Sequence, residues 1–399
     1  MRVVGMISGT SVDGVDVAVV DIAATDGVVH LQRIAEATVP FDPVLRAQVL
    51  AVLPPATTDT AALCRLDADL GRAFGAAARR VIDDLADGRA DLVVSHGQTV
   101  HHEVQDGQVV ATLQLGQPAE VAEATGLPVV ADLRARDVAA GGQGAPLVSR
   151  LDELVLTEAA QPVAALNLGG IANLTVVDPE RPTLAFDAGP ANALLDAAMR
   201  AAGDGHLDEG GRLTASGTVD DRLLAVLLDD PFLAAPPPKS TGKERYHGDY
   251  LADALAAAPV DRLDDRLATL AEAVAVAVAD HVRRHGVRRV VGSGGGVHNT
   301  GLVAALERRL ADVDATWSTS DEIGLPVDGK EAIAFALLGW LTWHGAAGTV
   351  PSATGAAGPR VLGSVTPGAG PLRLPAPLNA PVRRAVVSAP TRPPAHEVT

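Results

Sequence analysis

The stretch that decides the fold runs from Val3 to Ile22 and reads VVGMISGTSVDGVDVAVVDI. Residues 3–7 are apolar, residues 8–14 are mostly small, and residues 15–22 form a second, largely apolar segment. Apolar segments on both sides of a turn rich in glycine and serine predict two neighbouring strands joined by a tight loop.

The second half of the chain begins in the same way. Residues 163–168 are apolar, residues 169–173 read GGIAN, and residues 174–178 return to a strand-like pattern. Two strand–turn–strand units that open two halves predict duplicated α/β domains facing one cleft. Further strands are predicted at 28–39, 91–95, 128–131, 183–186 and 289–292, a hairpin turn at 105–108, and helices at 61–85, 118–125, 220–228, 249–257, 263–285, 299–310 and 330–343.

The domain boundaries follow from changes in composition. Residues 131–146 are polar and rich in glycine, which is typical of a hinge and binding segment. The first domain is therefore expected over 1–130, joined by part of the C-terminal region at about 345–375, and the second over 131–344. Ten prolines after residue 350 make this region hard to interpret, and residues 376–399 are expected to be a loosely ordered tail.

The bulk composition excludes several classes of function. A formal net charge of −17 argues against nucleic acid as the main partner, since such binding depends on clustered lysine and arginine. The single cysteine, Cys64, excludes an intramolecular disulfide and a multi-cysteine metal site. No secretory signal and no apolar run of roughly 18–20 residues is found, so we expect a cytoplasmic protein without a membrane partner.

The first turn is a candidate phosphate-binding loop. Gly9 and Gly14 can adopt positive φ, so that consecutive N–H groups can face one anion, and Thr10 and Ser11 add hydroxyl donors. No lysine follows the glycines, so this is not a Walker A loop. An ordinary hairpin turn with locally satisfied hydroxyls explains the same residues, and the turn alone leaves both readings open.

Two further glycine segments stand at predicted strand ends. Gly169-Gly170 occupies the equivalent position of the second half, and two matching turns would hold a polyphosphate from both sides of a cleft. Gly294-Gly295-Gly296 lies between a strand and a helix, where backbone can approach a flat ligand such as adenine. A plain turn and a flexible loop are the alternative interpretations.

Three histidines and two aspartates are candidate metal-binding residues. The spacing of His96, His101 and His102 matches no standard zinc pattern, and His96 is better interpreted as a hydrogen-bonding residue for a polar ligand. Asp13 or Asp16 could orient a water molecule on Mg²⁺. Direct metal ligands stay undefined by the sequence. A Ser-His-Asp hydrolase is disfavoured, since no Gly-x-Ser-x-Gly elbow surrounds a serine.

Asp187 follows the predicted strand 183–186 and precedes Gly189 and Pro190. A carboxylate held at a strand end can act as general base for an acceptor hydroxyl. The same residue can cap the helix predicted from Ala191, and local sequence alone favours capping.

Taken together, these segments resemble motifs of the anhydro-N-acetylmuramic acid kinase family. The matching stretches occur in the family's order and span about Gly5 to Leu341. They are Gly5–Asp16, Ser95–Thr99, Asp132–Asp137 with Ala139–Leu147, Asn167–Leu174, Phe186–Asn192, Gly294–Asn299 and Lys330–Ala336.

The resemblance implies two actin-like (ribonuclease H-like) α/β domains, each a mixed sheet flanked by helices, with a cleft between them. It implies ATP with Mg²⁺ and an anhydrosugar substrate, 1,6-anhydro-N-acetylmuramic acid. In the family, hydrolytic opening of the 1,6-anhydro ring is coupled to phosphorylation of O6. The products would be N-acetylmuramate 6-phosphate, used in peptidoglycan recycling, and ADP. A homodimer is also favoured.

By the same resemblance, Asp187 would activate the attacking water, and His96, Arg134 and Glu331 would lie near the sugar. The chain departs from the family at Ala188, where threonine is frequent, and also at Leu133 and Ala191, where phenylalanine and glycine are frequent. ATP would be bound by Gly9, Thr10, Ser11, Val12, Asp13, Gly14, Val15 and Asp16, together with Gly169, Gly170, Gly294, Gly295 and Gly296.

Two alternatives remain. The first is a kinase for another anhydrosugar such as levoglucosan, although Arg134 or Arg136 could supply the cation that a muramic carboxylate needs. The second is a non-catalytic actin-like ATPase. This alternative is disfavoured by the carboxylates placed for substrate chemistry and by the polar Arg/His segment between the two halves.

Overall fold

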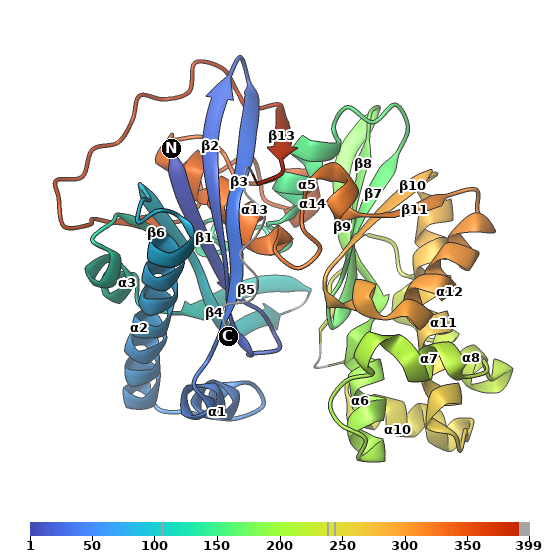
Figure 1. Cartoon of the computed structure of the whole chain (residues 1–399). Helices are drawn as coiled ribbons and strands as arrows, with labels where there is room; N and C mark the ends of the chain where they lie inside the picture. Colours follow the sequence, from blue (N-terminus) through green and yellow to red (C-terminus); the bar gives the residue numbers. More distant parts are fainter. Residues whose placement is uncertain (106, 238, 243–244, 391–399) are drawn as a thin grey trace. The chain divides into compact units, whose positions relative to one another are not determined.

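The computed structural model describes residues 1–105, 107–237, 239–242 and 245–390 (Figure 1). The chain divides into two compact units. Unit 1 contains Met1–Val155 and the chain from Gly329 onward, and unit 2 contains Leu156–Asp328. Among the described residues, no helix is long and apolar enough to cross a membrane.

Unit 1 is built on one mixed sheet with the strand order β12-β6-β4-β1-β2-β3-β13, and β5 pairs with β4. The N-terminal meander is antiparallel, whereas β4 is parallel to both β1 and β6. The strands are β1 (Arg2–Ser8), β2 (Gly14–Thr25), β3 (Val28–Pro40), β4 (Leu92–Gln105), β5 (Gln108–Leu115), β6 (Val129–Ala131), β12 (Ser364–Thr366) and β13 (Arg384–Ser388).

Successive side chains of β1 point to opposite faces of the sheet, and both sets are buried. Helices therefore cover both faces. Val4 and Met6 pack in the core that contains the apolar stripe of α2. Gly5 faces α13, where a Cβ atom would stand 2.1 Å from the carbonyl oxygen of Ala332. The helices are α1 (Pro43–Val52), α2 (Thr60–Leu85), α3 (Pro118–Thr125), α4 (Ala135–Val138), α5 (Ser149–Leu156), α13 (Lys330–Trp343) and α14 (Pro351–Thr354).

Unit 2 repeats the arrangement around a five-stranded sheet with the order β11-β10-β7-β8-β9. Its strands are β7 (Val163–Leu168), β8 (Ile171–Asp178), β9 (Arg181–Pro190), β10 (Arg289–Ser293) and β11 (Thr316–Thr319). Its helices are α6 (Asn192–Ala202), α7 (Arg212–Ser216), α8 (Asp221–Leu228), α9 (Pro231–Ala234), α10 (Gly248–Ala257), α11 (Leu263–Arg284) and α12 (Thr300–Ala311).

The two sheets share one topology. In each, the first strand pairs antiparallel with the second and parallel with the fourth, as β1 does with β2 and β4, and β7 with β8 and β10. The strand order β6-β4-β1-β2-β3 thus corresponds to β11-β10-β7-β8-β9. This correspondence confirms the predicted duplication and the actin-like α/β class, with mixed sheets flanked by helices.

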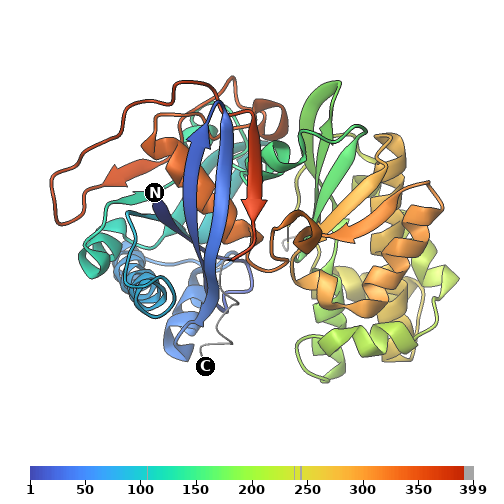
Figure 2. The same ribbon diagram turned by 45° about the horizontal axis from the view of Figure 1, so that its top comes forward.

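The unit boundaries lie elsewhere than expected. Residues 131–155 and 329–344 belong to unit 1. For 330–343 the reason is that α13 packs against β1 at Gly5. The expected tail also contains regular structure: β13 pairs parallel with β3, from Arg384 opposite Val28 to Ser388 opposite Gln32 (Figure 2). The last nine residues of that tail, 391–399, and Asp106 of the predicted hairpin turn lie outside the described residues.

Candidate active site

Asp187 lies within β9 and accepts three hydrogen bonds. Asn173 Nδ2 donates to Oδ1 at 2.9 Å, while the backbone N of Thr241 and the Oγ of Ser240 donate to Oδ2 at 2.8 and 3.2 Å. Only 9% of the residue is exposed. Burial raises the pKa of Asp187, and the bonds from Asn173, Thr241 and Ser240 and the nearby charge of Lys239 partly oppose this. A buried carboxylate with a raised pKa is suited to accept a proton.

The capping interpretation of Asp187 is wrong. Helix α6 begins at Asn192, with Ala191 as its N-cap residue. The N–H groups of Ala191 and Asn192 donate instead to the carbonyl oxygens of Gly170 and Gly169. The glycine pair therefore packs on the start of α6, and Asp187 is left for other chemistry.

Polar side chains form a row across four neighbouring strands of unit 2. Asp187 pairs in register with Asn173, Asn173 with Asn167, and Asn167 with Ser293. Directly paired residues of a sheet project from the same face. The row therefore connects the carboxylate with the ends of β7 and β10, where the two glycine segments begin.

The glycine cluster after β10 is needed for close packing. A Cβ atom on Gly294, which has φ +84°, would stand 2.4 Å from Oδ1 of Asn167, and one on Gly296 would stand 2.7 Å from Cβ of Leu168. At Gly295, by contrast, no described atom lies within 4 Å of that position. The structure thus brings Gly169-Gly170 and Gly294–Gly296 together on one edge of the sheet.

In unit 1, the first turn is connected to β4. Ser8 Oγ donates to Gln98 Oε1 at 2.7 Å, and Gln98 Nε2 donates to the carbonyl oxygen of Gly9 at 3.5 Å. Neither Gly9 nor Gly14 has the positive φ that we expected. The left-handed residue is the buried Val12, with φ +56°. Positive φ is strained for a β-branched residue, and such strain concentrates at functional sites.

The two candidate metal-orienting aspartates of this turn have protein partners. Arg46 of α1 forms an ion pair with Asp13 at 3.4 Å and donates to the carbonyl oxygen of Val12 at 3.0 Å. Asp16 accepts a hydrogen bond from Thr38 Oγ1 at 2.7 Å. Among the described residues, no group of three or more His, Cys, Asp and Glu side chains could hold a metal ion. Water-mediated contact to Mg²⁺ stays a prediction.

The three predicted sugar residues lie together in unit 1. Arg134 Nε donates to His96 Nε2 at 2.7 Å, and Arg134 Nη1 donates to the carbonyl oxygen of Gly144 at 2.6 Å. Because arginine only donates, the proton of His96 stands on Nδ1, which donates to the carbonyl oxygen of Gly97 at 2.9 Å. Burial and the Arg134 charge hold the pKa of His96 well below its usual value.

Glu331 enters this group from the first turn of α13. Burial raises the pKa of its carboxyl, and the charge of Arg134 opposes that shift. Next to it, Lys330 and Asp152 form a buried ion pair at 2.7 Å. The ring of His96 lies 4.5 Å, centroid to centroid, from that of Phe335, one turn further along α13. His96, Arg134 and the helix that carries Glu331 are therefore neighbours in unit 1.

Several residues that contact the candidate site residues were not identified from the sequence. Asp137 is fully buried and accepts hydrogen bonds from Gly144 N and Thr354 Oγ1, both at 2.8 Å, which fixes the glycine-rich segment behind Arg134. Asn173 belongs to the 169–173 turn, and no role of its own was predicted for it from the sequence. Ser240 and Thr241 stood in a polar run after three prolines, and that run was their only signal.

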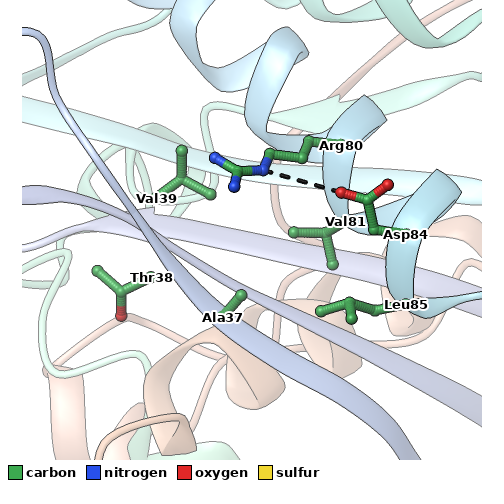
Figure 3. Close-up of a pocket in the computed structure, with 7 residues that line it drawn as sticks. All are labelled: Ala37, Thr38, Val39, Arg80, Val81, Asp84 and Leu85. Atoms are coloured by element: carbon green, nitrogen blue, oxygen red, sulfur yellow. Dashed lines mark ion pairs between the residues drawn. The ribbon is translucent and has the colours of Figure 1, made fainter. Parts of the chain in front are cut away.

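The hollow drawn in Figure 3 is separate from these residues. It lies between β3 and α2 and is lined by Ala37, Thr38, Val39, Arg80, Val81, Asp84 and Leu85. Arg80 and Asp84 pair across one turn of α2 at 3.8 Å. None of the predicted site residues lines this hollow, and we assign it no role.

The family model described as anhydro-N-acetylmuramic acid kinase matches residues 1–368. The chain is similar to the anhydro-N-acetylmuramic acid kinase of Streptomyces coelicolor, at 53% identity over 96% of this chain and 98% of that protein. It is also similar to the Streptomyces avermitilis protein of the same name, at 52% over 94% and 97%. A solved structure, the activator of the 2-hydroxyisocaproyl-CoA dehydratase from Clostridium difficile with bound ADPNP, aligns at 14% identity over 84% and 93% of the two chains, with a TM-score of 0.41. On its family match and its curated relatives, the chain belongs to the anhydro-N-acetylmuramic acid kinase family and is an enzyme of this kind.

Proposed function

We propose that the protein uses ATP and water to convert 1,6-anhydro-N-acetylmuramic acid into N-acetylmuramate 6-phosphate and ADP. Water adds to the anomeric carbon C1, the C1–O6 bond breaks, and O6 takes the γ-phosphoryl group of ATP. We place this reaction in the cytoplasmic recycling of peptidoglycan. The family match and the surroundings of Asp187 support this function.

The observation that carries the proposal is the hydrogen bonding of Asp187. A carboxylate has about four lone-pair sites. Among the described residues, Asn173, Ser240 and Thr241 donate to three of them, and a water molecule could take the fourth. Burial raises the pKa of Asp187 toward the range in which a carboxylate can remove a proton from water. In this step Asp187 takes that proton while O6 leaves C1.

The cluster of unit 1 would recognise the sugar. Two of the five N–H groups of Arg134 bind His96 and Gly144, so the guanidinium keeps its charge and further donors for the lactyl carboxylate. Glu331 would lie near the sugar.

The residues of the turns fit a nucleotide. Thr10 and Ser11 are exposed, and no described atom lies within 4 Å of a Cβ position on Gly9 or Gly295. Residues 9–16 would therefore hold the phosphates, as would Gly169 and Gly170, and Gly294–Gly296 would lie against the adenine. Mg²⁺, when bound, would neutralise charge on the phosphates. Asp13 and Asp16 would act on it only through water.

The test measures ADP release by the purified protein with three additions: 1,6-anhydro-N-acetylmuramic acid, levoglucosan and no sugar. We expect turnover only with the muramic sugar. In water enriched in ¹⁸O, the product should carry one heavy oxygen on C1 and none in its phosphate.

Two results would contradict the proposal. Turnover of levoglucosan alone would assign a different anhydrosugar. ATP hydrolysis that no sugar changes would favour the actin-like ATPase alternative.

A further inference from the structure

The segment between α9 and α10 supplies three contacts to Asp187. The backbone N of Asp187 donates to the carbonyl oxygen of Lys239 at 3.1 Å, and Ser240 Oγ and Thr241 N donate to its carboxylate. This segment has no regular structure between Ala235 and His247, with residues 238 and 243–244 outside the described part. The surroundings of the carboxylate therefore depend on how the segment is held.

Both ends of the segment are fastened to one buried carboxylate, Asp230, whose side chain is 3% exposed. Before the segment, Phe232 N donates to Asp230 Oδ1 at 2.9 Å. After it, Arg245 Nη2 donates to Oδ1 at 2.5 Å, and the hydroxyls of Tyr246 and Tyr250 donate to Oδ2 at 3.0 and 3.2 Å. Four donors from the entry and the exit of the segment thus meet on one side chain.

Lys239 fastens the middle of the segment. Its Nζ donates to the carbonyl oxygens of Phe232 and Leu233, at 2.8 and 3.1 Å, and lies 3.1 Å from Nε2 of His281 in α11. Burial lowers the pKa of Lys239 to about 8. The charge of Lys239 lowers the pKa of Asp187, and the described hydrogen-bond donors to the carboxylate, Asn173, Ser240 and Thr241 N, are neutral.

The Asp230 network keeps one protonation state around neutral pH. Burial raises the pKa of Asp230, but hydrogen bonds from Arg245, Phe232 N and Tyr246 outweigh burial and leave the pKa below its usual value. Burial and the Asp230 charge raise the pKa of Tyr250 to about 12. The carboxylate is therefore ionised and the hydroxyl is a donor whenever the enzyme works.

We propose that Asp230 is a positioning residue for Asp187. By joining the entry and the exit of the 231–246 segment, it keeps the Ser240 and Thr241 donors on Oδ2 of Asp187. The expected effect on catalysis rests on the proposed function, in which Asp187 is the base. The expected effect on the order of the segment is independent of that function.

The test compares Asp230→Asn and Arg245→Gln with the parent enzyme and with Asp229→Asn, which removes an exposed neighbouring carboxylate. The first measurement is hydrogen exchange of peptides covering 231–246 without ligands. Exchange should rise in both network variants and stay at the parent level in Asp229→Asn. This measurement needs no activity, so it remains valid if the parent turns over no anhydrosugar and the proposed function fails.

The second measurement is the pH profile of kcat. The Ser240 and Thr241 bonds lower the pKa of Asp187, so losing them should move the acid limb to higher pH, and kcat should fall by about 10- to 100-fold, the scale of an ångström-sized misplacement. Unchanged exchange, or raised exchange with an unchanged acid limb, would overturn the proposal. If Asp230→Asn does not fold, Arg245→Gln and Tyr250→Phe decide.

Discussion

Asn173 Nδ2 and Asp187 Oδ1 are joined by a hydrogen bond of 2.9 Å across the β8–β9 pair, in direct register. Because both residues belong to strands of the sheet, this bond fixes one oxygen of the carboxylate, while Ser240 and Thr241 donate to the other. The carboxylate is thus fixed on two sides by different elements of unit 2.

Removing the carboxylate should remove the chemistry and leave the fold. In Asp187→Asn the amide keeps the size of the side chain but cannot take a proton from water, so kcat should fall by about 10²- to 10⁴-fold. The melting temperature and ATP affinity should remain near those of the parent. Asp253→Asn, on the exposed side of α10, is the matched control. Turnover near the parent rate in Asp187→Asn would refute its role as base.

Removing the donor should change the titration of the base. Asn173→Ala deletes a hydrogen bond that lowers the pKa of Asp187, so the acid limb of the kcat profile should move to higher pH. A hydrogen bond to a charged group contributes about 1.5–3 kcal/mol, so kcat at neutral pH should fall by about tenfold or more. An acid limb at the parent position would show that Asn173 does not act on Asp187.

The sequence predicted the repeated architecture well because strand–turn–strand patterns are local. The Val3–Ile22 stretch and its counterpart at 163–178 both form the expected strands. The position of α13 was not predictable. It depends on Gly5, which lies more than 300 residues earlier and whose missing side chain leaves room for the Ala332 backbone.

The site was predictable to a similar degree. Motif residues such as Asp187 and Arg134 could be named, and Arg134 does contact His96. The hydrogen-bond partners of Asp187 could not be named from the sequence. Ser240 and Thr241 lie more than 50 residues later in the chain. They reach Asp187 through a segment that Asp230 contacts. We expected a positive φ at Gly9, but in this turn it occurs at Val12, whose apolar side chain is buried.

Stability should fall as the solution becomes mildly acidic. Burial, followed by the charges of Lys239 and Arg284, lowers the pKa of His281 to about 4, against a usual value of about 6.5. Between these values the unfolded chain binds a proton that the folded chain does not, so the free energy of unfolding decreases as pH falls from 6.5 to 4. His96, also held neutral by burial, acts in the same direction.

Denaturant unfolding at several pH values between 4 and 7 checks this pH dependence. His281→Gln keeps an acceptor for Lys239 but cannot titrate, so its unfolding free energy should depend less steeply on pH than that of the parent. His206→Gln, an exposed histidine of unit 2, is the control and should keep the parent slope. Equal slopes in all three proteins would contradict the assignment.

Asp137 holds the backbone behind Arg134 and leaves no room for a side chain at Gly142. A Cβ atom on Gly142 would stand 2.2 Å from Oδ2 of Asp137, the oxygen that accepts from Gly144 N. Gly142→Ala should therefore displace the buried carboxylate and destabilise unit 1 by about 1–3 kcal/mol, as overpacking does. Because Gly144 also accepts from Arg134, the KM for the sugar should rise. Gly248→Ala is the matched control, since no described atom lies within 4 Å of its Cβ position. Equal unfolding free energies and equal KM in the two variants would show that Asp137 does not hold this segment.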